Sequence, residues 1–294
     1  MEKAKTKKAL IVIFVIVATL VVGAYIALNY IFAGKVRSFL ATNKMTSTVL
    51  YDRVFVNVLA GSISFYNLRI IVNRVPITIA KLTLSGAKLA SNFPDTATIT
   101  ISNFNIPMQQ QLLGAYSVPL AALGYAAATG SAKLDVAYTR ANKSVKVNIA
   151  SIDLPKLGQL SGNVTFQNTP ERDWLSFTRN IMQKDISAAN VRFVNRGIMT
   201  NINNYFARKG NSTPAKAKDR TLRGINKRVM VSVRADEKRT LSQLYRFVET
   251  SGGLMIQLNE HSTIAKLLPN MQAVSGPRAG LLWMGRLPVN VIAN

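Results

Sequence analysis

An uncharged apolar run near the amino terminus constrains the chain most. Residues 9–33, ALIVIFVIVATLVVGAYIALNYIFA, contain no charged side chain. At about 1.5 Å per residue this run exceeds the roughly 30 Å hydrocarbon layer of a bilayer, so it predicts a transmembrane helix. No later stretch approaches this length. The sequence therefore predicts a single membrane span.

A cleaved signal peptide is the alternative interpretation of the same run. The apolar part of a signal peptide is normally about 7 to 15 residues long and ends at a small-x-small site. Here the run continues through Tyr25, Tyr30 and Phe32, which suit a membrane interface better than a cleavage site. We therefore favour an uncleaved anchor over a signal peptide.

Four lysines within residues 1–8 set the expected orientation of this anchor. Lys3, Lys5, Lys7 and Lys8 precede the apolar run, and basic residues resist translocation. We expect a cytoplasmic tail over 1–8, a transmembrane anchor over 9–33 and the rest of the chain beyond the membrane. This predicts a protein of the bacterial inner membrane whose carboxy-terminal domain is periplasmic.

The rest of the chain is strongly basic and contains no cysteine. From residue 34 there are 33 Lys or Arg (37 less the four before the anchor) and 12 Asp or Glu (13 less Glu2), a formal charge of +21. Such an excess indicates an anionic partner: lipid headgroups, a cell-wall polymer or nucleic acid. Nucleic acid is the least expected outside the cytoplasm. The alternative is basicity shared by the whole proteome, which would affect solubility only.

Apolar residues alternate with polar ones over much of residues 34–168. The pattern predicts a β-rich region with a half-buried antiparallel sheet and one apolar face. A bulge is expected at Tyr66 and Asn67, a helix over 118–128, and a hairpin from strands 132–139 and 144–152. The alternating residues include Val54, Val56, Val58, Ile63, Phe65, Leu68, Ile70, Ile77, Ile79, Leu82, Leu84, Ile99 and Ile101.

The pattern changes at residue 169. Thr169 and Pro170 predict one helix start, and Thr213 and Pro214 predict another. Helical spacing leads up to Gly210, while the stretches 191–194 and 254–258 have strand character. We therefore expect a helix-richer region over 169–294. The predicted fold class is α+β: the transmembrane helix, a mainly antiparallel sheet, and this helix-richer part packed on the sheet.

Few residues have the arrangement that catalysis requires. His261 is the only histidine, and a zinc site needs several ligands. No G-x-S-x-G elbow, phosphate-binding loop or closely spaced acidic pair occurs. The sequence predicts no enzyme activity, no metal and no cofactor.

A dense basic stretch begins at residue 208. Asp219 is its only acid. One interpretation is a solvated helix face, and the other is a surface that contacts anionic headgroups or polymer. The residues concerned are Arg208, Lys209, Lys216, Lys218, Arg220, Arg223, Lys227 and Arg228.

Three segments resemble the AsmA-like envelope proteins, relatives of the bridge-like lipid-transfer proteins. They are GSISFYNLRI at 61–70, VRFVNRGIMTNINNYFARKG at 191–210 and LYRFVETSGGLMIQLN at 244–259, which follow an amino-terminal apolar run. The resemblance implies a curved, taco-like β-sheet whose concave apolar face shields acyl chains. It implies no catalytic residue. This chain is short for the group, so a groove that spans the envelope is not expected.

Two functions of different class follow from these patterns. In the first, the apolar face binds lipid acyl chains through Phe65, Ile79 and Ile101, and the protein supports lipid transport or outer-membrane homeostasis. In the second, the protein is a non-catalytic envelope assembly or scaffold factor that docks protein partners or cell wall. An open concave face favours the first function, and a closed core favours the second.

Overall fold

The structure, a computed structural model, describes the chain from the end of the apolar run onward with several gaps. The predicted anchor lies almost entirely outside the described residues, as does the helix expected after Thr169. No helix in the described part is both long and apolar enough to cross a membrane. The described residues are 31, 33–42, 44–57, 60–86, 95–113, 117–169, 181–258, 261–263 and 289–293.

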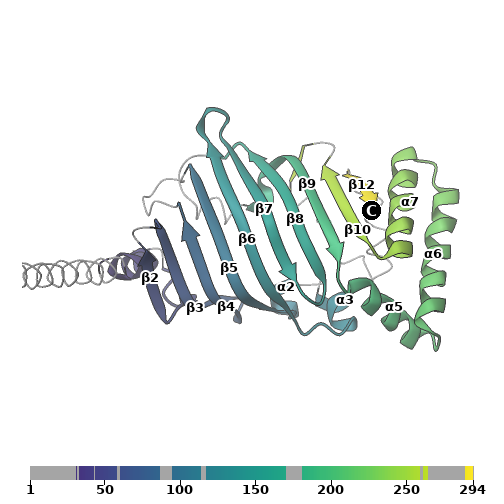
Figure 1. The fold of residues 1–294 in the computed structure, drawn as a ribbon, viewed down its shortest axis with the longest axis horizontal. Helices are drawn as coiled ribbons and strands as arrows, with labels where there is room; N and C mark the ends of the chain where they lie inside the picture. Colours follow the sequence, from purple (N-terminus) through teal and green to yellow (C-terminus); the bar gives the residue numbers. More distant parts are fainter. Residues whose placement is uncertain are drawn as a thin grey trace, which may run out of the picture.

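The 12 strands of the described chain form one antiparallel sheet (Figure 1). Its order is β1-β3-β4-β5-β6-β7-β8-β9-β10-β12, with β2 also paired to β3 and β11 to β9. Nearly every strand therefore pairs with the next one in the chain. The strands are β1 (Val49–Leu50), β2 (Arg53–Asn57), β3 (Ser62–Val72), β4 (Val75–Ser85), β5 (Thr96–Pro107), β6 (Ala127–Thr139), β7 (Ser144–Leu154), β8 (Gly158–Gln167), β9 (Asp185–Asn195), β10 (Gly253–Leu258), β11 (Ser262–Thr263) and β12 (Val289–Ala293).

A tight turn connects β3 to β4. Between β3 and β4, Val72 pairs with Val75, and the two turn residues Asn73 and Arg74 both have positive φ, at 49° and 66°. That is the backbone of a type I′ hairpin turn, whose twist matches that of the strands. The hairpin predicted over 132–152 is confirmed as β6 and β7.

The helices are short or lie near the ends of the sheet. Residues 33–42 are helical. The others are α2 (Gln110–Leu113), α3 (Ser117–Ala122), α5 (Ile198–Lys209), α6 (Pro214–Val231), α7 (Ala235–Thr250) and the 3₁₀ turns η2 (Arg140–Asn142) and η3 (Ile181–Gln183). Thr213 accepts a hydrogen bond from the Lys216 amide at 3.3 Å, and α5 ends at Gly210. Both helix boundaries agree with the sequence prediction.

The predicted α+β fold class is wrong. Strands β9 to β12 follow residue 168 and extend the same sheet, so the molecule is mostly antiparallel sheet with few helices. The transmembrane helix included in that prediction is not shown. The expected helix over 118–128 is also too long, because α3 ends at Ala122 and β6 begins at Ala127. Helical periodicity identified α5 to α7 but could not indicate that the short strands between them join the sheet.

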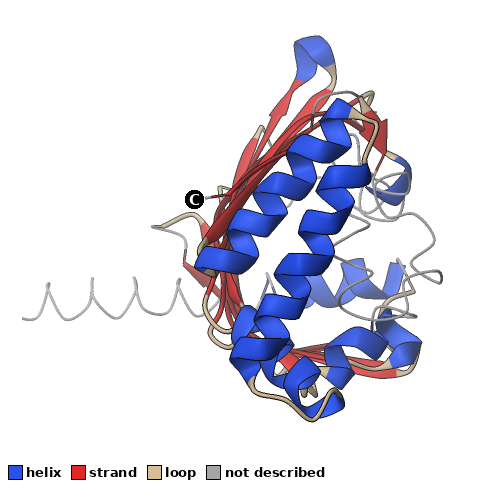
Figure 2. Ribbon diagram, turned by 90° about the vertical axis from the view of Figure 1, so that its right-hand side faces the viewer, coloured by secondary structure: helices blue, strands red, loops and turns tan. Residues whose placement is uncertain are grey.

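The sheet is curved, and α6 and α7 lie on its concave side (Figure 2). Register shifts between β5 and β6, β6 and β7, β7 and β8, and β8 and β9 accompany the curvature. Such bulges bend a strand and increase its twist. In the described part of the chain the strands therefore form an open sheet that encloses a concave face.

Buried side chains join the helices to the two ends of the sheet. The largest cluster lies between α5, α6, α7 and the strands β10 and β12, with Met199, Leu241 and Leu244 at most 1% exposed. The Tyr125 hydroxyl links α5 to this end: it accepts from Asn201 Nδ2 at 2.6 Å and donates to the Lys156 carbonyl at 3.0 Å. Burial raises the pKa of Tyr125, although the hydrogen bond from Asn201 acts in the opposite direction.

Candidate functional site

Paired residues form an apolar row across the whole sheet. Directly opposed side chains on neighbouring strands share one face, so each member of the row lies beside the next. The row runs through Val54, Phe65, Leu82, Ile101, Ala132, Ile152, Leu160, Phe193, Leu254 and Ala293.

A second row of pairs lies beside the first on the same face. It runs through Val56, Ile63, Leu84, Ile99, Leu134, Ile149, Gly162, Val191, Ile256 and Val291. We call the two rows together the apolar face. Ten strands at about 4.8 Å spacing make each row about 43 Å long.

Helices cover both ends of the apolar face. At one end, Val36 and Leu40 of the helix over 33–42 pack on Val54, Val56 and Ile63. At the other end, buried side chains of α7, including Leu241 and Leu244, form one cluster with the β10 and β12 residues Leu254, Val291 and Ala293. The apolar face is therefore the concave face on which α7 lies (Figure 2).

The middle of the apolar face is less covered than its ends. Its five central side chains are half-buried, and within the described part of the chain they join none of the four buried clusters. They come from five of the six neighbouring strands β4 to β9, with no member on β5. We call these residues the central patch: Leu84, Leu134, Ile149, Leu160 and Val191.

The three side chains predicted to bind lipid lie together. Phe65, Ile79 and Ile101 belong to one cluster with Leu68 and Phe104. Phe65 and Ile101 are half-buried members of the first row, whereas Ile79 is only 7% exposed and serves the packing of the cluster. The central patch therefore lies beside the predicted residues on the same face and, unlike Ile79, is half-buried.

Sequence reasoning did not select the central patch as a site. Leu134 and Ile149 were visible as the apolar side of a hairpin, but Leu160 stands among polar and glycine residues in GQLSGNVTFQ. Alternation alone could not assign that segment to the face. The missing signal is the register, because Leu160 is opposed by Ile152 and Phe193 on its two neighbouring strands.

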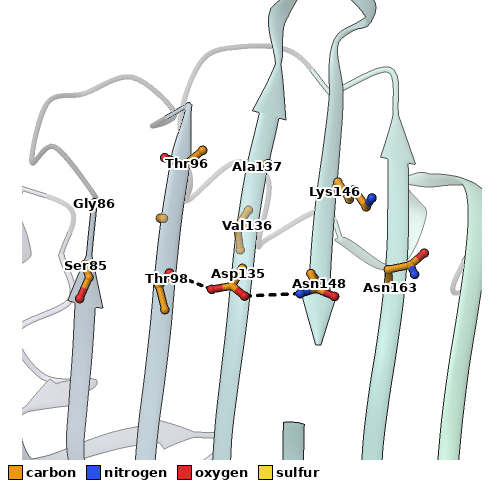
Figure 3. Close-up of a pocket in the computed structure, with 11 residues that line it drawn as sticks. Ser85, Gly86, Thr96, Thr98, Asp135, Val136, Ala137, Lys146, Asn148 and Asn163 are labelled. Atoms are coloured by element: carbon orange, nitrogen blue, oxygen red, sulfur yellow. Dashed lines mark hydrogen bonds between the residues drawn. The ribbon is translucent and has the colours of Figure 1, made fainter. Parts of the chain in front are cut away.

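The opposite face of the sheet is polar. One row of pairs on it consists of Ser62, Ser85, Thr98, Asp135, Asn148, Asn163, Asn190, Gln257 and Asn290. The Thr98 hydroxyl donates to Asp135 Oδ1 at 2.8 Å, and Asn148 Nδ2 donates to Asp135 Oδ2 at 3.4 Å (Figure 3). Both carboxylate oxygens of Asp135 are therefore engaged within the sheet.

A hollow of about 560 Å³ lies over part of this polar row. Among the described side chains that line it, Asp135 is the one acidic residue and Lys146 the one basic residue (Figure 3). A single carboxylate that already accepts two hydrogen bonds provides no acid–base pair. Within the described chain, no group of three or more His, Asp or Glu side chains could hold a metal ion, and His261 is an exposed residue before β11.

The eight predicted anion contacts lie at one end of the molecule. Arg208 and Lys209 end α5, and the other six are on α6. Lys218 reaches the end of α7, where its ammonium donates to the Glu249 carbonyl at 2.6 Å. Arg228 is half-buried, and Arg220 donates to the Ser212 hydroxyl. The other three predicted contacts on α6, Lys216, Arg223 and Lys227, are exposed, as is Arg220.

Comparison with known proteins assigns neither a family nor a function to the chain. The chain matches no family model, no curated protein and no solved structure. The resemblance to AsmA-like proteins therefore stays a prediction, and the functional argument depends on the geometry of the two faces.

Proposed function

We propose that the apolar face binds acyl chains of lipids and that the protein supports lipid transport or outer-membrane homeostasis in a bacterial envelope. The observation that carries the proposal is the central patch, where half-buried Leu, Ile and Val side chains lie between two covered ends. An extended acyl chain matches the shape of two parallel apolar rows. A polar or branched ligand does not.

The energetic gain from such binding is large enough to matter. Each methylene group transferred from water to an apolar surface contributes about 0.8 kcal/mol, so ten buried methylenes contribute about 8 kcal/mol before losses. Lost freedom of motion reduces this gain. The remainder is consistent with reversible binding, which a transport role requires.

We also propose that the protein is anchored in the inner membrane through residues 9–33, with its sheet in the periplasm. The uncharged run and the lysines before it support this location. An anchor keeps the apolar face near a source of lipid and raises its effective concentration there.

Site-specific photocrosslinking in living cells tests the lipid proposal. Benzoylphenylalanine is placed in the full chain either at Ile149, in the central patch, or at Asn148, its exposed neighbour on the polar face of β7. Cells are grown with radiolabelled acetate so that acyl chains carry the label. We expect a labelled lipid adduct at position 149 and at least fivefold less at position 148.

The identity of the adduct separates the alternatives. A crosslink from position 149 to another segment of the same chain would show that the apolar face is a closed core, and the lipid proposal fails. A crosslink to a different protein instead supports the assembly or scaffold function. Equal lipid labelling at 148 and 149 would show general contact with membrane lipid and also contradicts the proposal.

A further inference from the structure

Helix α6 is the outermost element at its end of the molecule. Its contacts are with α7 and α5, and it lies at the edge opposite the helix over 33–42 (Figure 1). Ala217, Thr221 and Ile225 are its buried residues, and they define its inner side. The opposite side of α6 faces away from the sheet.

Four basic residues form a stripe along that outer side. Lys216, Arg220, Arg223 and Lys227 recur at intervals of four, three and four residues and are all exposed. That spacing places side chains on one face of a helix. The 18-residue helix is about 27 Å long, so the stripe is long enough to contact several lipid headgroups.

The apolar residues at the end of α6 are unusually exposed. Met230 and Val231 are 73% and 68% exposed, and Val233 in the turn to α7 is 98% exposed. Met230 continues the stripe by helical spacing, three residues after Lys227. An apolar tip that follows a basic stripe has the composition of a surface that enters the interfacial layer of a bilayer.

We propose that α6 docks on an anionic bilayer surface, with the basic stripe on the headgroups and the Met230–Val233 tip inserted among them. Charge complementarity identifies this occupant. Three acids lie nearby: Asp219 on α6, and Asp236 and Glu237 at the start of α7. Asp236 is paired with Arg234 at 2.5 Å, and Glu237 accepts from Ser232 at 3.1 Å.

This docking does not depend on acyl-chain binding by the apolar face, and the two proposals can fail separately. It does determine where the docked bilayer lies relative to the helix over 33–42. The docking surface and the helix over 33–42 lie at opposite ends of the sheet (Figure 1), which separates them by about the 43 Å width of ten strands. The bilayer that α6 contacts is therefore remote from the amino-terminal helix.

A fluorophore at the tip tests insertion directly. The natural chain has no cysteine, so Val231→Cys gives a single site for an environment-sensitive nitrobenzoxadiazole label. The full chain is held in nanodiscs of phosphatidylcholine and mixed with separate vesicles. We expect a blue shift and a severalfold rise in emission with phosphatidylglycerol vesicles, reversed by high salt, and no change with phosphatidylcholine vesicles.

Charge and position controls make the result specific. On the Val231→Cys background, changing Lys216, Arg220, Arg223 and Lys227 to Gln should raise the vesicle concentration for half-maximal signal at least tenfold. Changing the exposed Arg69, Lys133, Lys146 and Arg192 to Gln removes the same charge. It should change the vesicle concentration for half-maximal signal less than twofold. A label at Ser131→Cys, on the polar face of β6, should not respond.

The proposal is overturned if anionic vesicles produce no change at position 231. It is also overturned if neutral vesicles produce the same change, or if the two sets of Gln substitutions have equal effects. A response at both 231 and 131 would indicate general adsorption and contradicts docking through α6.

Discussion

Gly162 shows how one residue permits the curvature of the sheet. It lies in β8 beside the register shift with β7, and its φ is +138°, in a region that side chains rarely adopt. A Cβ atom at this position would lie 2.1 Å from the Asn190 carbonyl oxygen on β9. The close approach of β8 and β9 therefore requires glycine.

Alanine at this position should be strongly destabilising. We expect Gly162→Ala to lower the free energy of unfolding by about 3 kcal/mol. Alanine disfavours this φ, and its Cβ atom would clash with the Asn190 carbonyl oxygen. Chemical denaturation measured by circular dichroism provides the value.

Gly224 provides the matched control. It lies inside α6, and a Cβ there would meet nothing within 4 Å. Gly224→Ala should therefore stabilise the protein by about 1 kcal/mol through helix propensity. Equal effects of the two substitutions would contradict the role of Gly162 in the close approach of the strands.

Asn67 shows what a single sequence can reveal at the residue scale. The sequence predicts a bulge at Tyr66 and Asn67 because apolar alternation changes phase there. In the structure Asn67 has a φ of 50°, and Phe65 and Leu68 pack in the same cluster on either side of it. The bend near Gly162 gave no such signal, because its cause is a contact with a neighbouring strand.

At the scale of elements, β6 and β7 carry the sharpest test of the apolar face. We expect the double variant Leu134→Lys and Ile149→Lys to lose most of its copurifying lipid after detergent extraction, measured by mass spectrometry. Both residues are half-buried, so the free energy of unfolding should fall by only about 2 kcal/mol.

The same strands provide the control on their other face. Ser131→Lys and Asn148→Lys add the same charge at exposed positions and should leave the lipid content unchanged. If Leu134→Lys with Ile149→Lys instead unfolds the protein, the face is a closed core. A charge at Ile79 is less informative, because that side chain is 7% exposed and its loss should unfold the strand pair.

Helices were easier to predict than strands because their signals are local. Thr213 and Pro214 start α6 and Gly210 ends α5, as expected. The alanines at 126–128 favour a helix by propensity, yet Ala127 and Ala128 pair with Pro107 and Ile106 of β5. Tertiary pairing overrides a weak local preference.

For the whole molecule, the division at residue 168 failed as a fold class because the boundary of a sheet is not a local property. Strand β8 pairs with β9 across a gap in the described chain, and β10 returns to β9 after three helices. Those pairings join residues far apart in sequence. A single sequence contains their strand propensity but not their partners.

Orientation in the membrane is the prediction that belongs to the whole chain. A reporter that is active only in the cytoplasm, fused after Asn294, should show no activity, because we expect the lysines before residue 9 to hold the amino terminus in the cytoplasm. The same reporter fused before Met1 should be active. Strong activity of the carboxy-terminal fusion would overturn both the orientation and the periplasmic location.

The helices over both ends of the apolar face have a kinetic consequence for the proposed lipid binding. An acyl chain cannot slide in at one end of the rows and leave at the other, since Val36 and Leu40 occupy one end and Leu244 the other. It must enter and leave sideways, between the two long margins of the sheet. Transfer by such a protein proceeds by separate loading and unloading encounters, so its rate rises with the number of copies and saturates when every copy is filled.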